Sequence, residues 1–136
     1  MLLTIAGVLN AAQLDKIRES VAEARFVDGR LTAGRAAGRV KNNEELEPEP
    51  RIHQRITRIA MSALGHNADF RNAALPYRMA DFIVARYQPG MTYGDHVDDP
   101  IMGTTGPRFR SDVSMTRFLN PPDSYAGGGL VIRSAC

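Results

Sequence analysis

The sequence has little cysteine and no long apolar stretch. Its single cysteine, Cys136, excludes an internal disulfide, so we expect a protein of the reducing cytoplasm. No run approaches the roughly 18 apolar residues that a membrane-spanning helix needs, so we expect no membrane partner. The apolar start, residues 1–9, has no basic leader and no small-residue cleavage site, which favours a first strand over a signal peptide.

Neither sign of charge is in large excess, because 17 basic and 15 acidic side chains give a net charge of +2. A dedicated nucleic-acid binder carries a clear basic surplus. One cluster, Arg30, Arg35, Arg39 and Lys41, keeps a nucleic-acid module open as a hypothesis. No aromatic residue lies between Arg30 and Lys41 to stack on bases. We therefore expect a solvated loop or a rim over an active site, and no nucleic-acid partner.

With 136 residues, 43% of them hydrophobic, the chain has the size of one domain. A first helix is predicted over residues 11–25, with Asn10 as its N-cap and Gln13 completing a capping box. A second helix is predicted over residues 50–65, with Pro50 in its first turn. Its apolar residues at helical spacing are Ile52, Ile56, Ile59 and Ala63.

Strand patterns dominate the second half of the chain. A short strand is predicted at residues 2–5, loops with short strands at 27–46, and a turn with a short helical piece at 66–74. Further strands are predicted at residues 77–87, 91–97, 111–119 and 130–132. Helices first and strands last indicate an α+β domain with an antiparallel sheet. We expect a helical region over residues 1–75 and a sheet region over 76–136, forming one structural unit.

The strongest chemical signal is His96-Val97-Asp98, in a segment predicted to be extended. Side chains two residues apart in an extended chain point to the same side. A histidine nitrogen and a carboxylate oxygen on one side are two of the three ligands of a 2-His-1-carboxylate Fe(II) site. Three histidines and nine aspartates give this spacing by chance at about 20%, so a strand histidine bonded to a neighbour is the simpler alternative. His53 and His66 are interpreted as structural.

The predicted strand at residues 111–119 alternates in polarity. The residues that share its more polar face are Asp112, Ser114, Thr116 and Phe118. A polar face that ends in an aromatic residue is typical of a sheet lining a wet cleft. Taken alone, the segment is also compatible with a half-exposed strand that lines no site.

A set of short motifs covers nearly the whole chain, from Met1 to about Ile132. They are Leu2-Leu3-Thr4-Ile5-Ala6-Gly7-Val8, Val27-Asp28-Gly29, Thr32-Ala33-Gly34, Lys41-Asn42-Asn43, Ala73-Ala74-Leu75-Pro76, Arg86-Tyr87 with Gly90, His96-Val97-Asp98, Arg110-x-Asp112-x-Ser114-x-Thr116-x-Phe118-Leu119 and Pro122-x-x-Tyr125-x-Gly127-Gly128-x-Leu130-x-Ile132. In this order they resemble the bacterial PKHD-type hydroxylases. These are relatives of prolyl 4-hydroxylase among the Fe(II)- and 2-oxoglutarate-dependent dioxygenases, and some are associated with iron uptake.

The resemblance implies a double-stranded β-helix, a jelly roll related to the cupins, with the N-terminal helices packed against it. It implies that His96 and Asp98 bind Fe(II), with no catalytic residue beyond these ligands, and that L-ascorbate keeps the iron reduced. Tyr87 occupies the position of a tyrosine near 2-oxoglutarate; a core aromatic is the alternative. Arg86 and Arg110 resemble structural residues or residues that support the metal ligands from outside the site. The implied reaction is oxidative decarboxylation of 2-oxoglutarate coupled to hydroxylation of a small molecule or a protein side chain.

The sequence departs from the family pattern near its end. Family members continue with strands that supply a second histidine ligand and a basic residue that pairs with 2-oxoglutarate. No histidine follows His96 here, and the residues after Ile132 no longer resemble the family. We therefore expect a C-terminally truncated chain with an incomplete jelly roll, inactive alone. The alternative function is a non-catalytic remnant that binds a partner or forms a homo-oligomer through its open sheet edge.

Overall fold

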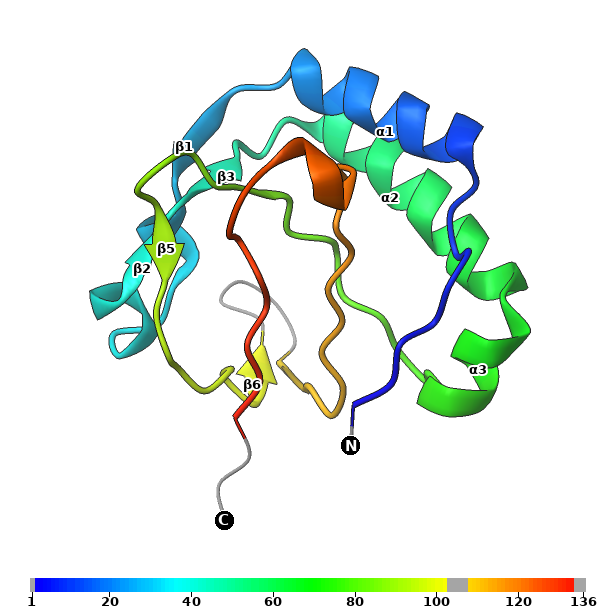
Figure 1. The fold of residues 1–136 in the computed structure, drawn as a ribbon. Helices are drawn as coiled ribbons and strands as arrows, with labels where there is room; N and C mark the ends of the chain where they lie inside the picture. The colour runs from blue at the N-terminus through cyan, green and yellow to red at the C-terminus, as the bar shows by residue number, and fades with distance from the viewer. Residues whose placement is uncertain (1, 103–107, 134–136) are drawn as a thin grey trace.

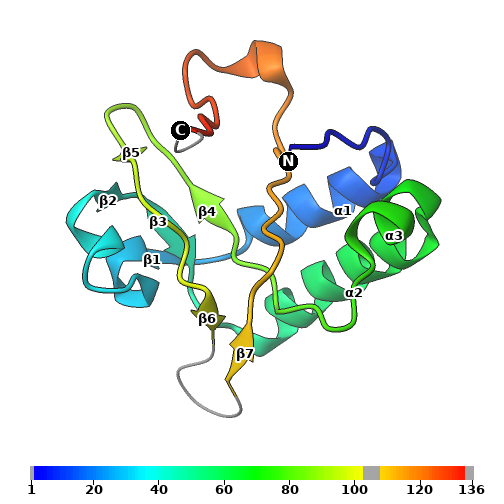
Figure 2. The ribbon, with the colours of Figure 1, turned by 90° about the horizontal axis from the view of Figure 1, so that it is seen from below.

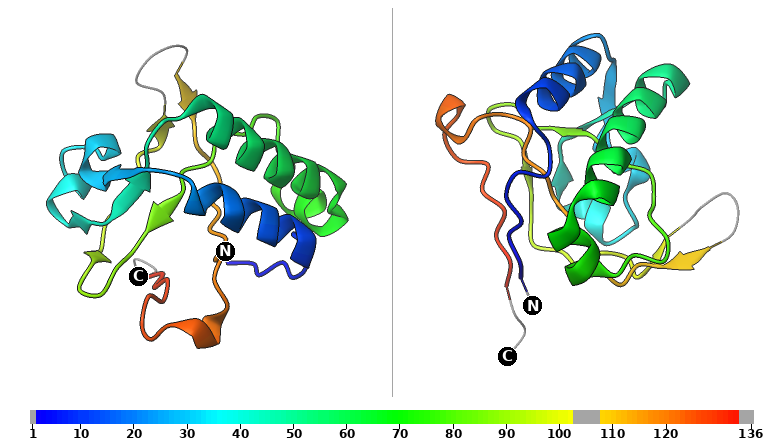
Figure 3. Two further views of the ribbon diagram at one scale, coloured as in Figure 1. Left: turned by 90° about the horizontal axis from the view of Figure 1, so that it is seen from above. Right: turned by 90° about the vertical axis from the view of Figure 1, so that its right-hand side faces the viewer.

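The computed structural model describes residues 2–102 and 108–133 of the chain (Figure 1). Three α-helices gather on one side of the molecule and most of the short strands on the other, as Figure 1 and the views from above and below show (Figures 2 and 3). The helices are α1 (Ala11–Ala22), α2 (Pro50–His66) and α3 (Ala68–Ala74). In the described residues, none of them is both long and apolar enough to cross a membrane.

Helix α1 begins where its capping residues predict. The Asn10 side chain accepts a hydrogen bond from the Gln13 backbone, and the Gln13 side chain accepts one from the Asn10 backbone, so the capping box is confirmed. The helix ends at Ala22, three residues before the predicted end. It buries Ile17 and Ser20, whose hydroxyl donates to the carbonyl of Lys16.

Helix α2 also matches its prediction closely. Pro50 occupies its first turn, and the Glu49 carboxylate accepts hydrogen bonds from the backbone amides of Arg51 and Ile52. The helix runs one residue past the predicted end, to His66. The helical piece predicted within residues 66–74 is α3, which is capped by Asn67.

The strands form three small antiparallel sheets in the described residues. Strands β1 (Phe26–Asp28), β3 (Glu44–Leu46) and β4 (Ala85–Arg86) lie in the order β1-β3-β4. Strand β2 (Lys41–Asn42) pairs with β5 (Thr92–Tyr93), and β6 (Ile101–Met102) pairs with β7 (Phe109–Arg110). The 3-10 turns are η1 (Gly29–Thr32), η2 (Ala37–Arg39) and η3 (Pro122–Ser124).

Several predicted strands are wrong in the described part of the chain. Residues 2–5, 111–119 and 130–132 form no strand, while 77–87 and 91–97 shrink to the two-residue strands β4 and β5. A strand requires a hydrogen-bonded neighbour as well as a suitable pattern of side chains. Residues 112–118 are all exposed, so the predicted polar face is no more exposed to solvent than the opposite face. The mixed α+β class is confirmed, whereas the jelly roll stays a prediction.

The core lies between helices α1 and α2 and the sheet β1-β3-β4. Its buried residues are Leu9, Ile17, Leu46, Ile56, Ala63 and Val84. Residues 111–133 are mostly exposed, and the orange part of this segment projects from the rest of the ribbon in Figure 2. One contact fastens it to α1: the Arg18 guanidinium donates to the Leu119 carbonyl, with Nε at 2.8 Å and Nη2 at 2.6 Å.

Candidate metal centre

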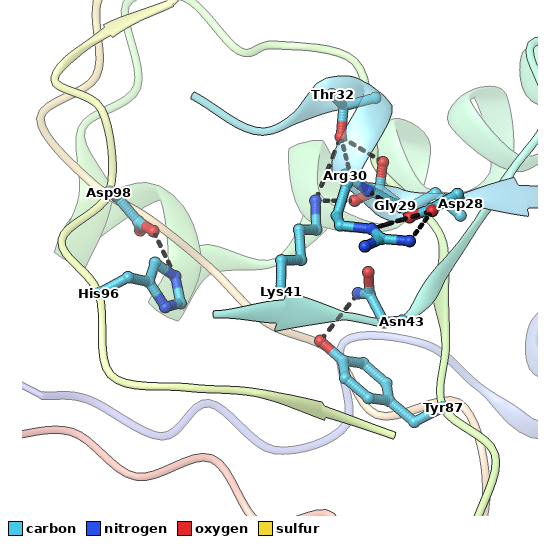
Figure 4. A network of polar contacts seen from close by, with 10 residues as sticks. Asp28, Gly29, Arg30, Thr32, Lys41, Asn43, Tyr87, His96 and Asp98 are labelled. Carbon is cyan, nitrogen blue, oxygen red and sulfur yellow. Dashed lines mark hydrogen bonds and ion pairs between the residues drawn. The ribbon is translucent and has the colours of Figure 1, made fainter. Parts of the chain in front are cut away.

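The two predicted metal ligands lie together in the segment that follows β5 (Figure 4). His96 Nε2 is 3.4 Å from Asp98 Oδ1, as expected for side chains two residues apart in an extended chain. The His96 side chain is 24% exposed and that of Asp98 is 66% exposed. Solvent and small molecules can therefore reach the pair.

The hydrogen bond made by His96 Nδ1 determines whether Nε2 is a hydrogen-bond donor or an acceptor. His96 Nδ1 lies 2.7 Å from the carbonyl oxygen of Gly94, which can only accept, so Nδ1 carries a proton. In the neutral ring Nε2 then holds a lone pair and faces a carboxylate oxygen. A proton on Nε2 or a metal ion would bridge the two acceptors.

Tyr93, in strand β5, lies flat against His96. The ring centroids are 3.7 Å apart and the planes differ by 8°. Burial raises the pKa of the Tyr93 hydroxyl, and the nearby carboxylate of Asp98 adds to this effect. Tyr93 therefore stays a neutral phenol at neutral pH.

A buried ion pair lies behind Tyr93. The Lys41 ammonium donates to the Glu45 carboxylate and, at 3.2 Å, to the hydroxyl of Thr32 (Figure 4). Its Nζ is 5.2 Å from the centre of the Tyr93 ring. Lys41 and Glu45 are 7% and 5% exposed. Lys41 is therefore not part of an exposed basic surface, since its ammonium is buried and paired with Glu45.

Tyr87 is held by Asn43 at the edge of the same region (Figure 4). Asn43 Nδ2 donates to the Tyr87 hydroxyl at 3.0 Å. Asn43 is 4% exposed, whereas Tyr87 is 48% exposed and so is not a core aromatic. Gly29 makes room for Asn43, because a Cβ at position 29 would lie 2.0 Å from Asn43 Oδ1. Since its oxygen accepts from Asn43, Tyr87 keeps its own proton for another acceptor.

The arginines flanking these residues make structural contacts. Arg86 pairs with Glu44 at 2.8 Å and lies 4.0 Å from the centre of the Phe26 ring. Arg110 pairs with Asp112. Both contacts agree with the structural role that the sequence indicates for Arg86 and Arg110.

The donor set fits a divalent transition metal in part. An imidazole nitrogen and a carboxylate oxygen suit Fe(II). With metal–ligand bonds of roughly 2.1 Å, two adjacent ligands lie ~3 Å apart, close to the 3.4 Å seen here. Among the described residues, no three His, Cys, Asp or Glu side chains converge. His53 and His66 both lie on α2, and the Nδ1 of His66 contacts the carbonyl of Ser62.

Comparison with known proteins decides the family. No protein-family model matches the chain. A PKHD-type hydroxylase of Thioalkalivibrio sulfidiphilus is 48% identical over 134 residues, covering 98% of this chain and 60% of the relative. One of Synechococcus elongatus is 46% identical over 136 residues (100% and 61%), and one of Cupriavidus metallidurans 41% over 136 residues (98% and 60%). The chain belongs to the PKHD-type hydroxylase family.

The resemblance in the sequence motifs is thereby confirmed. The chain spans about 60% of the length of these PKHD-type hydroxylases. The match extends over essentially all of this chain, so it includes His96, Asp98 and Tyr87.

The pattern of the sequence does not single out Tyr93 as a neighbour of His96. It also does not single out Asn43 as the partner of Tyr87, or Glu45 as the partner of Lys41. Tyr93 and His96 stack across the bend at Asp95, while the Gly94 amide continues the pairing beyond β5 by donating to the carbonyl of Val40 at 2.8 Å. A signal for Asn43 does exist, because it lies in Lys41-Asn42-Asn43, one of the motifs on which the resemblance to PKHD-type hydroxylases is based. Its contact with Tyr87, 44 residues away, could not be derived from spacing.

Proposed function

We propose that this chain supplies His96 and Asp98 to the Fe(II) centre of a 2-oxoglutarate-dependent hydroxylase. One observation carries the proposal: His96 Nε2, left as an acceptor by the bond from Nδ1 to Gly94, faces Asp98 Oδ1 at 3.4 Å. The family name of the relatives supports a hydroxylase. The proposal of Fe(II) and 2-oxoglutarate rests on the imidazole and carboxylate ligands, and on the resemblance of the sequence motifs to PKHD-type hydroxylases.

Each residue has a distinct task in this proposal. The neutral imidazole of His96 and the negative carboxylate of Asp98 hold Fe(II). The Tyr87 hydroxyl, fixed by Asn43, donates a hydrogen bond to a carboxylate oxygen of 2-oxoglutarate. With iron, 2-oxoglutarate and O₂ bound, the site would supply oxidative decarboxylation of the 2-oxo acid to succinate and CO₂. One oxygen atom of O₂ would enter succinate and the other would convert a substrate C–H bond into an alcohol. L-Ascorbate is the proposed reductant, and the substrate is a small molecule or a protein side chain.

Binding of Fe(II) is the direct test of these assignments. Anaerobic equilibrium dialysis should show one Fe(II) per chain in the wild type and loss of binding in His96→Ala and Asp98→Ala. His66→Ala, which removes an exposed histidine of α2, is the matched control and should bind like the wild type. Equal binding by all four proteins would contradict the proposal.

Turnover by the isolated chain is expected to be absent. The described residues offer two ligands instead of three, so the remaining positions on the ion are left to water and 2-oxoglutarate. An assay for succinate in the presence of Fe(II), 2-oxoglutarate and ascorbate should give no signal above a metal-free control. Iron-dependent succinate formation would show that two protein ligands suffice.

A second candidate function is self-association without catalysis. Apolar side chains in the last part of the chain are strongly exposed, among them Val113, Leu130, Val131 and Ile132. Such groups mark contact surfaces when they are contiguous. Light scattering would show a dimer that Val131→Asp dissociates; a monomer at all concentrations would remove this alternative.

A further inference from the structure

We propose that Tyr93 is a positioning residue for His96, holding the plane of its imidazole so that Nε2 faces Asp98. The inference rests on the proposed role of His96 as a metal ligand. It assigns to Tyr93 a task that neither the His-x-Asp motif nor the names of the relatives imply.

The imidazole of a half-exposed histidine needs two constraints to keep one orientation. Its second side-chain torsion is broad, because rotation about an sp³–sp² bond has shallow minima. The bond from Nδ1 to the Gly94 carbonyl fixes one atom of the ring. The Tyr93 ring, stacked at 3.7 Å and within 8° of parallel, fixes the plane. Together the two contacts determine where Nε2 points.

Tyr93 can act in this way because it is itself held from two sides. Its backbone pairs with Lys41 in the β2–β5 ladder. The ammonium of Lys41 lies 5.2 Å from the centre of its ring and is kept there by the buried carboxylate of Glu45. Moving Lys41 away would leave a buried charge without its partner, which is costly. The Lys41–Glu45 ion pair therefore helps to hold the Tyr93 ring in place against the imidazole of His96.

The stack can be tested in the metal-free chain by NMR of labelled histidine. A ring stacked on an aromatic face shifts its C–H protons upfield, and the nitrogen shifts report which nitrogen carries the proton. We expect both signatures for His96 in the wild type and in Tyr93→Phe, which keeps the ring. Tyr93→Leu should lose the upfield shift and show a mixture of the two protonated nitrogens. Tyr77→Leu, at a fully exposed tyrosine, is the matched control.

Anaerobic Fe(II) titration supplies the second readout. Tyr93→Leu should weaken Fe(II) binding about tenfold, while Tyr93→Phe should change it by less than about twofold. Circular dichroism verifies that each variant keeps its helices. A wild-type His96 signature that persists in Tyr93→Leu, with unchanged affinity, would overturn the inference. A wild type that shows the stack but binds no Fe(II) would instead refute the proposed function, and with it the role of Tyr93 in metal binding.

Discussion

At the scale of single residues, the spacing of the sequence predicts that His96 and Asp98 lie close together, but it does not predict the contacts around them. His96 and Asp98 are two residues apart, so extended geometry alone brings them together. Asn43 and Tyr87 are 44 residues apart, and their hydrogen bond depends on the pairing of distant strands. Contacts of this kind have no local signal, because the same residue types occur in many sequences without meeting.

The glycine at position 29 gives a test of the Asn43 contact. Gly29→Ala would place a Cβ 2.0 Å from Asn43 Oδ1, so the amide must move away from Tyr87. We expect a loss of about 1–3 kcal/mol in the free energy of unfolding, measured with urea, and a shifted Asn43 side-chain amide signal. Gly34→Ala is the control, since nothing lies within 4 Å of its added Cβ. Equal stability of the two variants would contradict the close packing at Gly29.

The carboxyl of Asp28 should titrate unusually low. Its hydrogen bonds with the Arg30 side chain and backbone lower its pKa from the ordinary 3.8 to about 2. Because the folded-state pKa is the lower one, the contribution to stability is present above pH 4 and is lost as the pH falls towards 2. NMR titration should find this pKa raised in Arg30→Gln and unchanged in Arg35→Gln. A pKa near 3.8 in the wild type would show that the pair does not persist in solution.

At the scale of elements, helices are predicted well and strands poorly. The start of α1 depends on Asn10 and Gln13, and the start of α2 on Glu49 and Pro50, all within a few residues of the helix itself. The strands depend on partners elsewhere in the chain. Residues 111–119 have the composition of a strand, but among the described residues they pair with no other strand, so the prediction fails there.

The capping box of α1 should contribute measurably to stability. Asn10→Ala removes the acceptor for the Gln13 amide and should lower the free energy of unfolding by about 1 kcal/mol. Asn10→Ser retains an N-cap oxygen and should stay close to the wild type. Denaturant unfolding followed by circular dichroism measures both. An unchanged Asn10→Ala variant would mean that tertiary packing alone determines where α1 begins.

At the scale of the whole molecule, a side-chain contact joins helix α1 to the last part of the chain. The double hydrogen bond from Arg18 to the Leu119 carbonyl links α1 to the segment that follows β7. Leu119 also packs on the edge of the core. The sequence predicts the α+β class but not this link. In the sequence, an arginine that donates to a distant carbonyl cannot be distinguished from any other exposed arginine of a helix.

Limited proteolysis tests the link through Arg18. Arg18→Met should speed chymotryptic cleavage after Phe118 several-fold, because the segment loses its anchor on α1 while Phe118 stays exposed. Arg35→Met, in a loop remote in sequence from this contact, serves as the control and should leave the rate unchanged. The same cleavage rate in Arg18→Met and the wild type would show that the anchor does not restrain the segment.

The measurement that tests the central claim most directly is an anaerobic titration of the chain with Fe(II), in the presence and absence of 2-oxoglutarate. A weak visible charge-transfer band should appear only when both are present, and it should vanish in His96→Ala and Asp98→Ala while persisting in His66→Ala. Such a result would place iron and 2-oxoglutarate at His96 and Asp98. A band that survives the loss of His96, or a wild type that gives no band at any iron concentration, would contradict the account.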